Sequence, residues 1–442
     1  MKKLFAPLIC ALLCAVVLCT PALAAGESPS VVINGEPMEV SDAPAKLVQG
    51  RTMIPFRSVF LALGFADEDI HWNSATRTIS ATKGTVTVSF TIDQKQVTVL
   101  RDGDAVTTPT DVAPYLDPET NRTYIPARYV AEALDCRVGW DAQRRTVIID
   151  DVNALLANNQ ETYELMEQYQ LWTQRFQSQS WQTQGSFTVD QNKGELVMAC
   201  DNFTMYATGT GSELEGTIRL SGSGAAGLPS AIDAVVRGDS QTGAYYFHSK
   251  SLMEEGAEVG AATVWYQMEY GSDSQTPGES VYGDLLEWVD PEQTDGTYED
   301  LIRSKLEALP LDNAEMTCAD LLALYNRLAG DSGFERREEG YVNSFSQGGR
   351  TYSLVLKGSR EGINGYTMRA SYPDPDGVQV SVESSLSQTE MKLSLQRSNP
   401  YTGKSLTMEA EGTLKVTDRP ALTAPPNSAV IVSLDRLAEF SR

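Results

Sequence analysis

Gly50-Arg51-Thr52-Met53-Ile54-Pro55-Phe56-Arg57 returns later in the chain as Asn121-Arg122-Thr123-Tyr124-Ile125-Pro126-Ala127-Arg128. Each copy continues through an apolar stretch to a tryptophan, Trp72 in the first copy and Trp140 in the second. Self-similarity of this kind identifies a repeated structural unit. The sequence therefore predicts a duplicated module.

Each copy has the pattern of a small α+β unit. Apolar residues at Val59, Phe60 and Leu63 share one face of a helix that begins near Pro55, and Gly64 follows where a helix end favours a left-handed residue. The residues after Trp72 are rich in β-branched side chains, which favours a hairpin. We expect two repeats, at about 31–98 and 99–150, to form one domain over residues 30–150.

These residues resemble the copper amine oxidase N-terminal-like domain, which occurs in secreted proteins of Gram-positive bacteria. The shared pattern is an Asn-Gly turn, then G-R-T-x-(V/I)-P-x-R, an apolar helix ending in Leu-Gly, a tryptophan and a β-branched strand. The second copy departs from it with Asn121 and Asp135 in place of glycines. The resemblance implies an accessory α+β module and no copper chemistry.

The rest of the chain predicts a different architecture. Residues 151–180 read as a connecting amphipathic helix, with an apolar stripe at Leu165, Tyr169, Trp172 and Phe176. Residues 181–442 alternate like antiparallel strands, with helices expected at 281–289, 298–309 and 318–328. The predicted class is α+β: a duplicated small α+β module followed by a large antiparallel β-sheet domain with inserted helices. This second part is distantly similar in architecture to the half-barrels of lipoprotein-carrier proteins, on no specific motif.

The N-terminus and the charge indicate a protein outside the cytoplasm. Residues 1–24 combine Lys2 and Lys3 with an apolar run and an Ala-Leu-Ala site, the pattern of a cleaved signal peptide. We therefore expect a secreted, envelope-associated protein without a stable membrane span. The net charge of −24 disfavours nucleic acid as a partner. Three cysteines, Cys136, Cys200 and Cys318, follow the signal, and we expect buried free thiols unless two of them pair.

Residue types argue against several kinds of catalysis. The chain has two histidines, His71 and His248, which are too few for the three copper ligands of an amine oxidase. No G-x-S-x-G nucleophile motif occurs. We predict no enzymatic activity, no metal site and no cofactor.

The repeated polar and aromatic residues are the first candidates for a binding site. The four arginines either bind carboxylates of a wall polymer or pair with acids of the module, and recurrence in both copies favours the structural role. The two tryptophans either stack on sugars or fill the core, and core packing is favoured. These candidates are Arg51, Arg57, Trp72, Arg122, Arg128 and Trp140.

Three functional hypotheses follow. The leading one is a secreted, non-catalytic, cell-envelope-associated binding or accessory protein that contacts peptidoglycan or wall polymers. The second is a carrier or sensor of a hydrophobic small molecule, enclosed by the C-terminal sheet in a cavity lined by Phe187, Tyr246, Trp265 and Tyr352. The third is a carboxylate-dependent cell-wall hydrolase with two acids in a cleft.

Overall fold

The computed structural model describes residues 28–38, 43–239, 242–250, 264–269, 297–314, 316–347, 349–373 and 377–433. They form two compact units. The N-terminal unit contains residues 28–161 and 297–327, and the sheet unit contains the described residues of 162–269 and 328–433. The predicted signal at 1–24 and the predicted helix at 281–289 lie outside the described residues.

The repeat module of the N-terminal unit is built from short strands and two short α-helices. Its helices are α2 (Phe56–Ala62) and α3 (Ala127–Ala133). Its strands are β1 (Ser30–Ile33), β2 (Glu36–Pro37), β3 (Lys46–Val48), β4 (Arg51–Pro55), β5 (Ile70–Asn73), β6 (Thr78–Lys83), β7 (Val86–Thr91), β8 (Gln96–Arg101), β9 (Asp104–Pro109), β10 (Tyr115–Asp117), β11 (Arg122–Pro126), β12 (Arg137–Asp141) and β13 (Thr146–Asp150). They make three sheets, in the orders β10-β11-β4-β3, β12-β13-β1-β2 and β5-β6-β7-β8-β9.

The two copies of the repeat meet about a local two-fold axis. Strands β4 and β11 pair antiparallel, and Ile54 lies opposite Ile125, the residue at the same position of the other copy. Lys46 and Asp117 also occupy equivalent positions, and they form an ion pair with an N–O distance of 3.0 Å. The duplicated sequence thus forms one body in which each copy completes the other.

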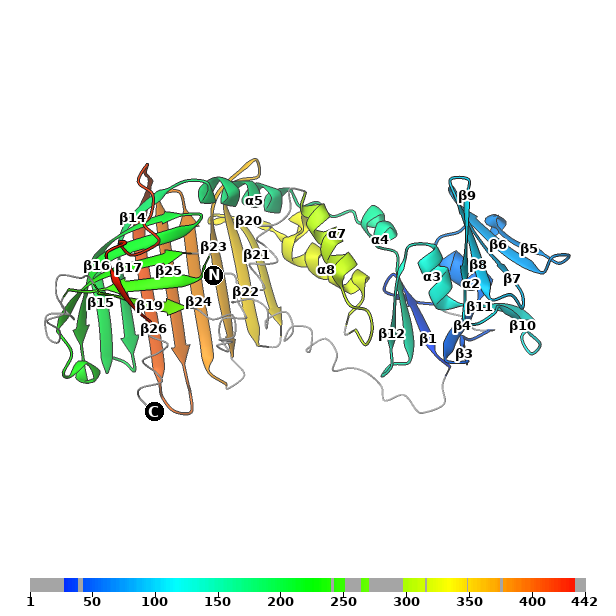
Figure 1. The fold of residues 1–442 in the computed structure, drawn as a ribbon, viewed down its shortest axis with the longest axis horizontal. Helices are drawn as coiled ribbons and strands as arrows, with labels where there is room; N and C mark the ends of the chain where they lie inside the picture. The colour runs from blue at the N-terminus through cyan, green and yellow to red at the C-terminus, as the bar shows by residue number, and fades with distance from the viewer. Residues whose placement is uncertain are drawn as a thin grey trace. The chain divides into compact units, whose positions relative to one another are not determined.

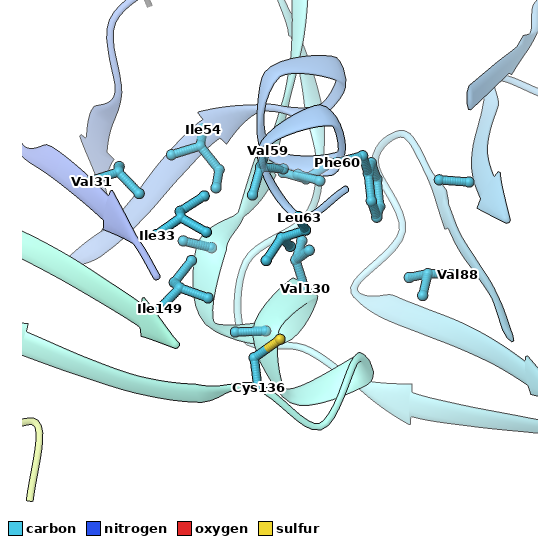
Figure 2. Packing of buried hydrophobic residues seen from close by; sticks show 14 of the residues in the cluster. Val31, Ile33, Ile54, Val59, Phe60, Leu63, Val88, Val130, Cys136 and Ile149 are labelled. Atoms are coloured by element: carbon cyan, nitrogen blue, oxygen red, sulfur yellow. The ribbon is translucent and has the colours of Figure 1, made fainter. Parts of the chain in front are cut away.

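A large apolar cluster joins the two copies. Val59, Phe60 and Leu63 of the first copy are buried, as the helical pattern predicted, and they pack in one cluster with Val130 of the second copy (Figure 2). The helix ends also correspond, because Gly64 and Asp135 both adopt left-handed backbone, with φ of 80° and 57°. Asp135 is tolerated there because Asp is one of the few side chains that visit this region.

Two helices from much later in the sequence belong to the N-terminal unit. They are α7 (Tyr298–Ala308) and most of α8 (Cys318–Ala329), which confirms the helices predicted at 298–309 and 318–328. Each begins with a capping box. Thr297 and Thr317 each accept a hydrogen bond from the backbone N–H of an aspartate three residues later, and that aspartate accepts one in return.

The segment between these helices is bound along β12. The backbone N–H of Trp140 donates to Asp312 Oδ1 at 3.0 Å, and its carbonyl accepts from Asn313 N at 3.0 Å. Gly139 permits this approach, because a Cβ atom there would lie 2.3 Å from the Leu311 oxygen. The structure therefore differs from the predicted domain of residues 181–442, since residues 297–327 pack with the repeat module.

The connecting region is two helices, not the single one predicted over 151–180. Helix α4 (Val152–Asn158) ends where Asn159 turns to extended backbone, and α5 (Glu164–Gln177) begins after a polar stretch. Asp331 caps the N-terminus of α5, because its carboxylate accepts hydrogen bonds from the backbone N–H groups of Glu164 and Leu165. A capped start of this kind makes a helix break favourable.

The sheet unit contains one antiparallel sheet of fourteen strands, apart from one parallel pair at an edge (Figure 1). This confirms the predicted α+β class with a large sheet. Its order is β20-β21-β22-β23-β24-β25-β26-β14-β15-β16-β17-β18-β19-β27. The strands are β14 (Trp181–Gln191), β15 (Leu196–Thr208), β16 (Gly211–Ser221), β17 (Ala231–Asp239), β18 (Ala244–His248), β19 (Val264–Glu269), β20 (Glu335–Arg337), β21 (Gly340–Gln347), β22 (Arg350–Ser359), β23 (Gly362–Pro373), β24 (Gln379–Ser387), β25 (Glu390–Ser398), β26 (Ser405–Val416) and β27 (Val430–Ser433).

Helix α5 lies along one end of these strands (Figure 1). Tyr169 and Trp172 of the helix contact the ring of Tyr366 on β23 edge to face, with centroid distances of 5.7 and 6.2 Å. At the other end of the helix, Phe176 stacks on Trp181 of β14 at 4.3 Å. The predicted apolar stripe of this helix thus packs on the sheet. In the part of the chain that is described, no helix is long and apolar enough to cross a membrane.

Candidate functional site

The repeated arginines of the first copy are engaged within the module. Arg51 Nε lies 2.6 Å from Asp111 Oδ2, and Arg57 pairs with Asp67 and donates to the carbonyl of Ile70 at 3.3 Å. These contacts agree with the structural role expected from their recurrence. The second copy does not repeat them in full: Arg122 is exposed at the start of β11, and Arg128 is exposed and has no ion pair or hydrogen bond with the described residues.

The repeated tryptophans have different environments. Trp140 is half-buried and packs against the core of the module, as the sequence predicted. Trp72 instead has 41% of its surface exposed, so the expectation that it fills the core is wrong. The reason is its position on β5, the edge strand of its sheet, where no described segment covers it as residues 309–313 cover β12. An exposed ring of this kind is available to a partner.

The large sheet separates its residues onto two chemically distinct faces. Successive side chains of a strand point to opposite faces, and paired residues share a face. Following the register across the strands gives one face on which most side chains are apolar, called the apolar face below. It includes Phe187, Val189, Met198, Met205, Leu214, Ile218, Val236, Val382, Leu386, Leu393, Leu395, Met408 and Leu414.

Most of the apolar face is incompletely covered. Next to α5, on β22 and β23, Leu354, Leu356 and Met368 are fully buried. Farther along the sheet, from β24 through β17, the apolar residues named above are only half-buried. A covered core would exclude solvent from such side chains. The face is therefore apolar over many strands and still partly accessible.

The four predicted cavity residues do not lie together. Phe187 and Tyr352 are on the apolar face. Tyr246 and Trp265 are on the opposite, polar face, because Tyr246 pairs with Arg237 and Arg237 with Glu213. These four residues therefore do not line one cavity, because two of them lie on each face of the sheet. Side-chain type in a strand does not reveal the face, which depends on register.

The polar face carries an ion cluster that the sequence did not reveal. Glu213 is 1% exposed and pairs with both Arg237 and Arg419, at 3.1 and 3.0 Å. The Arg237 guanidinium lies 4.8 Å from the centre of the Trp265 ring and donates to the carbonyl of Ala424. These contacts fix the segment after β26 against β16 and β17. Its residues come from three distant parts of the chain, so no local motif marks it.

The buried thiols and a buried acid have strongly altered acidities. All three described cysteines are buried and unpaired, and burial raises the pKa of Cys136 and of Cys318 to about 12. Burial also raises the pKa of Asp150, which accepts a hydrogen bond from the backbone N–H of Cys318 at 2.8 Å. Thiols with such a pKa stay protonated and are poor nucleophiles. The described residues contain no group of three or more potential metal ligands.

Comparison with known families identifies the repeat module. Residues 32–149 match the family model of the copper amine oxidase N-terminal domain. The resemblance seen in the doubled sequence is thereby confirmed for this domain. The copper amine oxidase N-terminal domain is a non-catalytic module in some proteins, and the match ends before the large sheet begins. No curated protein matches the chain.

Proposed function

We propose that this chain is a secreted, non-catalytic binding protein whose large sheet binds an apolar ligand on its apolar face. The observation that carries the proposal is that the apolar residues of that face named above, from β24 through β17, are only half-buried. Large accessible apolar patches on a soluble protein mark sites for ligands or partners. The role combines the binding protein expected from the sequence with the carrier or sensor hypothesis. The signal-like segment at 1–24 supports placing it outside the cytoplasm.

Burial of an apolar chain supplies the affinity. Removing apolar surface from water contributes roughly 25 cal/mol per Å². Side chains such as Leu393, Leu395 and Met408 offer no hydrogen bonds that would select a particular polar group. The centre of the face therefore suits hydrocarbon, and any selection among ligands comes from polar residues at its ends.

A fluorescence titration tests this proposal. N-phenyl-1-naphthylamine brightens when it leaves water, and we expect saturable binding to the purified protein. Leu395→Glu places a carboxylate on the apolar face and should weaken binding at least about tenfold, because an unpaired charge in apolar surroundings is costly. The matched control is Gln396→Glu, one residue along the same strand and exposed on the other face.

A second strand repeats the comparison. Phe187→Glu on β14 should weaken binding, whereas Thr188→Glu, on the polar face of the same strand, should leave it unchanged. Absence of probe binding to the unaltered protein would reject the proposal. Equal loss from both members of each pair would also count against it, because the effect would then not belong to one face.

A wall-polymer role for the module is the second candidate, and the exposure of Trp72 favours it. An accessible indole stacks on sugar rings. Retention of the protein on purified peptidoglycan measures this role directly. We expect Trp72→Ala to reduce retention and Arg128→Ala, an exposed control in the other copy, to leave it unchanged. Equal retention of the Trp72→Ala variant and the unaltered protein would exclude Trp72 as the contact.

A further inference from the structure

One end of the apolar face carries buried polar groups that form no hydrogen bond with the described residues. Tyr352 on β22 is 6% exposed, and its hydroxyl has no hydrogen-bond partner among the described residues. Arg350 lies two residues earlier on the same strand, and therefore on the same face. Its Nη1 atom is buried and, within the part of the chain that is described, also lacks a hydrogen-bond partner. Buried polar groups in folded proteins are almost always hydrogen-bonded. Two neighbouring donor groups without such a bond therefore need an explanation.

The electrostatics of these two groups favour an anion. Burial raises the pKa of the Tyr352 hydroxyl, so it stays protonated and can donate a hydrogen bond. Arg350 lies two residues from Tyr352 on the same face of β22, which places its charge roughly 7 Å along the strand from that tyrosine. An arginine and a neutral tyrosine together offer donors and one positive charge. Such a pair matches a carboxylate or phosphate oxygen.

The distribution of charge over the whole sheet points the same way. From β21 through β18, every Asp and Glu that pairs in register lies on the polar face: Asp190, Glu213, Glu215, Asp233, Asp239, Glu383, Glu390, Glu409 and Glu411. Asp201 lies in the bulge of β15 and pairs with Arg219. The ionisable cations of the apolar face over these strands are Arg350 and Arg397. The chain as a whole carries a net charge of −24. Even so, no Asp or Glu that pairs in register on these strands lies on the apolar face.

Both arginines lie toward the same end of the strands. Arg397 pairs with Val380, and Val380 pairs with Tyr372 on β23. Ser371, next to Tyr372, pairs with Thr351, so this row of residues continues to Arg350 on β22. Helix α5 packs at the opposite end, on Tyr366 and Trp181. The face therefore has an aromatic, helix-covered end and an arginine-bearing end.

We propose that Arg350 and Tyr352 bind the anionic head group of an amphiphilic ligand, a carboxylate or phosphate on an acyl chain, whose hydrocarbon lies along the apolar face. This inference rests on the proposed function and names its ligand class. The head group would accept hydrogen bonds from the Tyr352 hydroxyl and from Arg350 Nη1. The acyl chain of the ligand would extend across the strands toward β24 and beyond.

Competition among ligands that share one chain length tests the head group. Dodecanoate, dodecyl phosphate and dodecanol each compete with N-phenyl-1-naphthylamine for the purified protein. We expect at least one of the two anions to bind about tenfold more tightly than dodecanol, the size of effect typical of a hydrogen bond to a charged group. Which anion does so distinguishes a carboxylate from a phosphate ligand. Inorganic phosphate alone should not compete.

Two variants assign the effect to these residues. Arg350→Gln should bring the anions to within about twofold of dodecanol and leave dodecanol itself unchanged. Tyr352→Phe preserves the ring and should weaken only the anions, so it serves if Arg350→Gln does not fold. Lys392→Gln removes a positive charge from the polar face and is the control.

The outcomes separate this inference from the proposed function. Equal affinity of the unaltered protein for both anions and dodecanol would overturn the head-group site and leave apolar binding intact. Competition by inorganic phosphate as strong as by dodecyl phosphate would also overturn it, since the site would then bind a free anion. If neither the probe nor any ligand binds, the proposed function itself fails.

Discussion

Trp72 and Trp140 occupy the same position in the two copies of the repeat, yet only one of them is covered. In the second copy, residues 309–313 lie along β12 and bond to the backbone of Trp140. In the first copy, the matching strand β5 is a sheet edge, and Trp72 is 41% exposed. Two nearly identical scaffolds thus present two different surfaces.

One residue accounts for much of this difference. Gly139 lets the Leu311 backbone approach β12, whereas His71 stands at the matching position of the first copy. A side chain there would overlap an approaching segment. The comparison teaches that the repeat specifies the scaffold, while positions that differ between the copies specify what each copy binds.

Replacing each tryptophan in turn should give the largest change in the free energy of unfolding, and the two changes should differ strongly. We expect Trp140→Ala to destabilise the protein by about 3 kcal/mol, because it removes a large ring from the module core. Trp72→Ala should cost less than about 1 kcal/mol, since exposed side chains contribute little. Denaturant unfolding of both variants measures the difference. Equal losses would mean that the two environments are alike.

Making the second copy resemble the first should release the bound segment. In Gly139→Ala, the new methyl group overlaps the Leu311 backbone, and we expect a loss of about 2 kcal/mol, in the range for overpacked sites. Limited proteolysis should then cut within residues 309–317 faster than in the unaltered protein. His71→Ala in the first copy is the matched control and should change neither property. Unaltered protection of the segment in Gly139→Ala would contradict the role given to Gly139.

The buried Asp150 should give the second copy a pH dependence of its own. Burial raises its pKa, so the folded state holds the proton more tightly than the unfolded state. The stability this provides is full below the ordinary pKa of about 4 and is lost as pH rises through the folded pKa. Asp150→Asn lacks this loss. We therefore expect the variant to gain stability relative to the unaltered protein as pH rises above about 4.

Denaturant unfolding at several pH values checks this expectation. The first copy has Thr82 at the matching position, bonded to Thr87 at 3.0 Å, so Thr82→Val serves as the control without a titrating group. A stability difference between Asp150→Asn and the unaltered protein that stays constant with pH would contradict the raised pKa.

The repeated arginines should show the smallest effects. Arg57→Ala removes the pair with Asp67 and the bond to the Ile70 carbonyl, and we expect a loss of about 0.5–1 kcal/mol, as for exposed pairs. Arg128→Ala should change the free energy of unfolding by less than about 0.5 kcal/mol. High salt should reduce the first loss and not the second. A larger loss from Arg128→Ala would reveal a contact absent from the described residues.

Local patterns predicted the elements well where one short stretch contains the whole signal. The repeat predicted the module, and the helices predicted at 298–309 and 318–328 are present in the structure. The break between α4 and α5 was missed, because Asp331, which caps α5, is far away in the sequence. A cap supplied from a distance leaves no local trace.

The candidate site was predicted in part. Phe187 and Tyr352 were predicted to line one cavity, and both lie on the apolar face. Tyr246 and Trp265 were grouped with them on aromatic character alone, and they lie on the other face. Arg350 was not considered, because a single arginine in a strand is usually a solvent-exposed residue. Its significance comes only from burial beside an apolar face.

The sequence by itself determined the kind of elements, the duplication and the resemblance to a known module, because periodicity, caps and motifs act over a few residues. Tertiary structure alone decided that residues 297–327 pack with the module, that Trp72 stays exposed, and that the acids of the sheet lie on one face. These outcomes depend on strand register and on contacts between distant segments. A shift of one residue in register would exchange the two faces, and no local pattern fixes it.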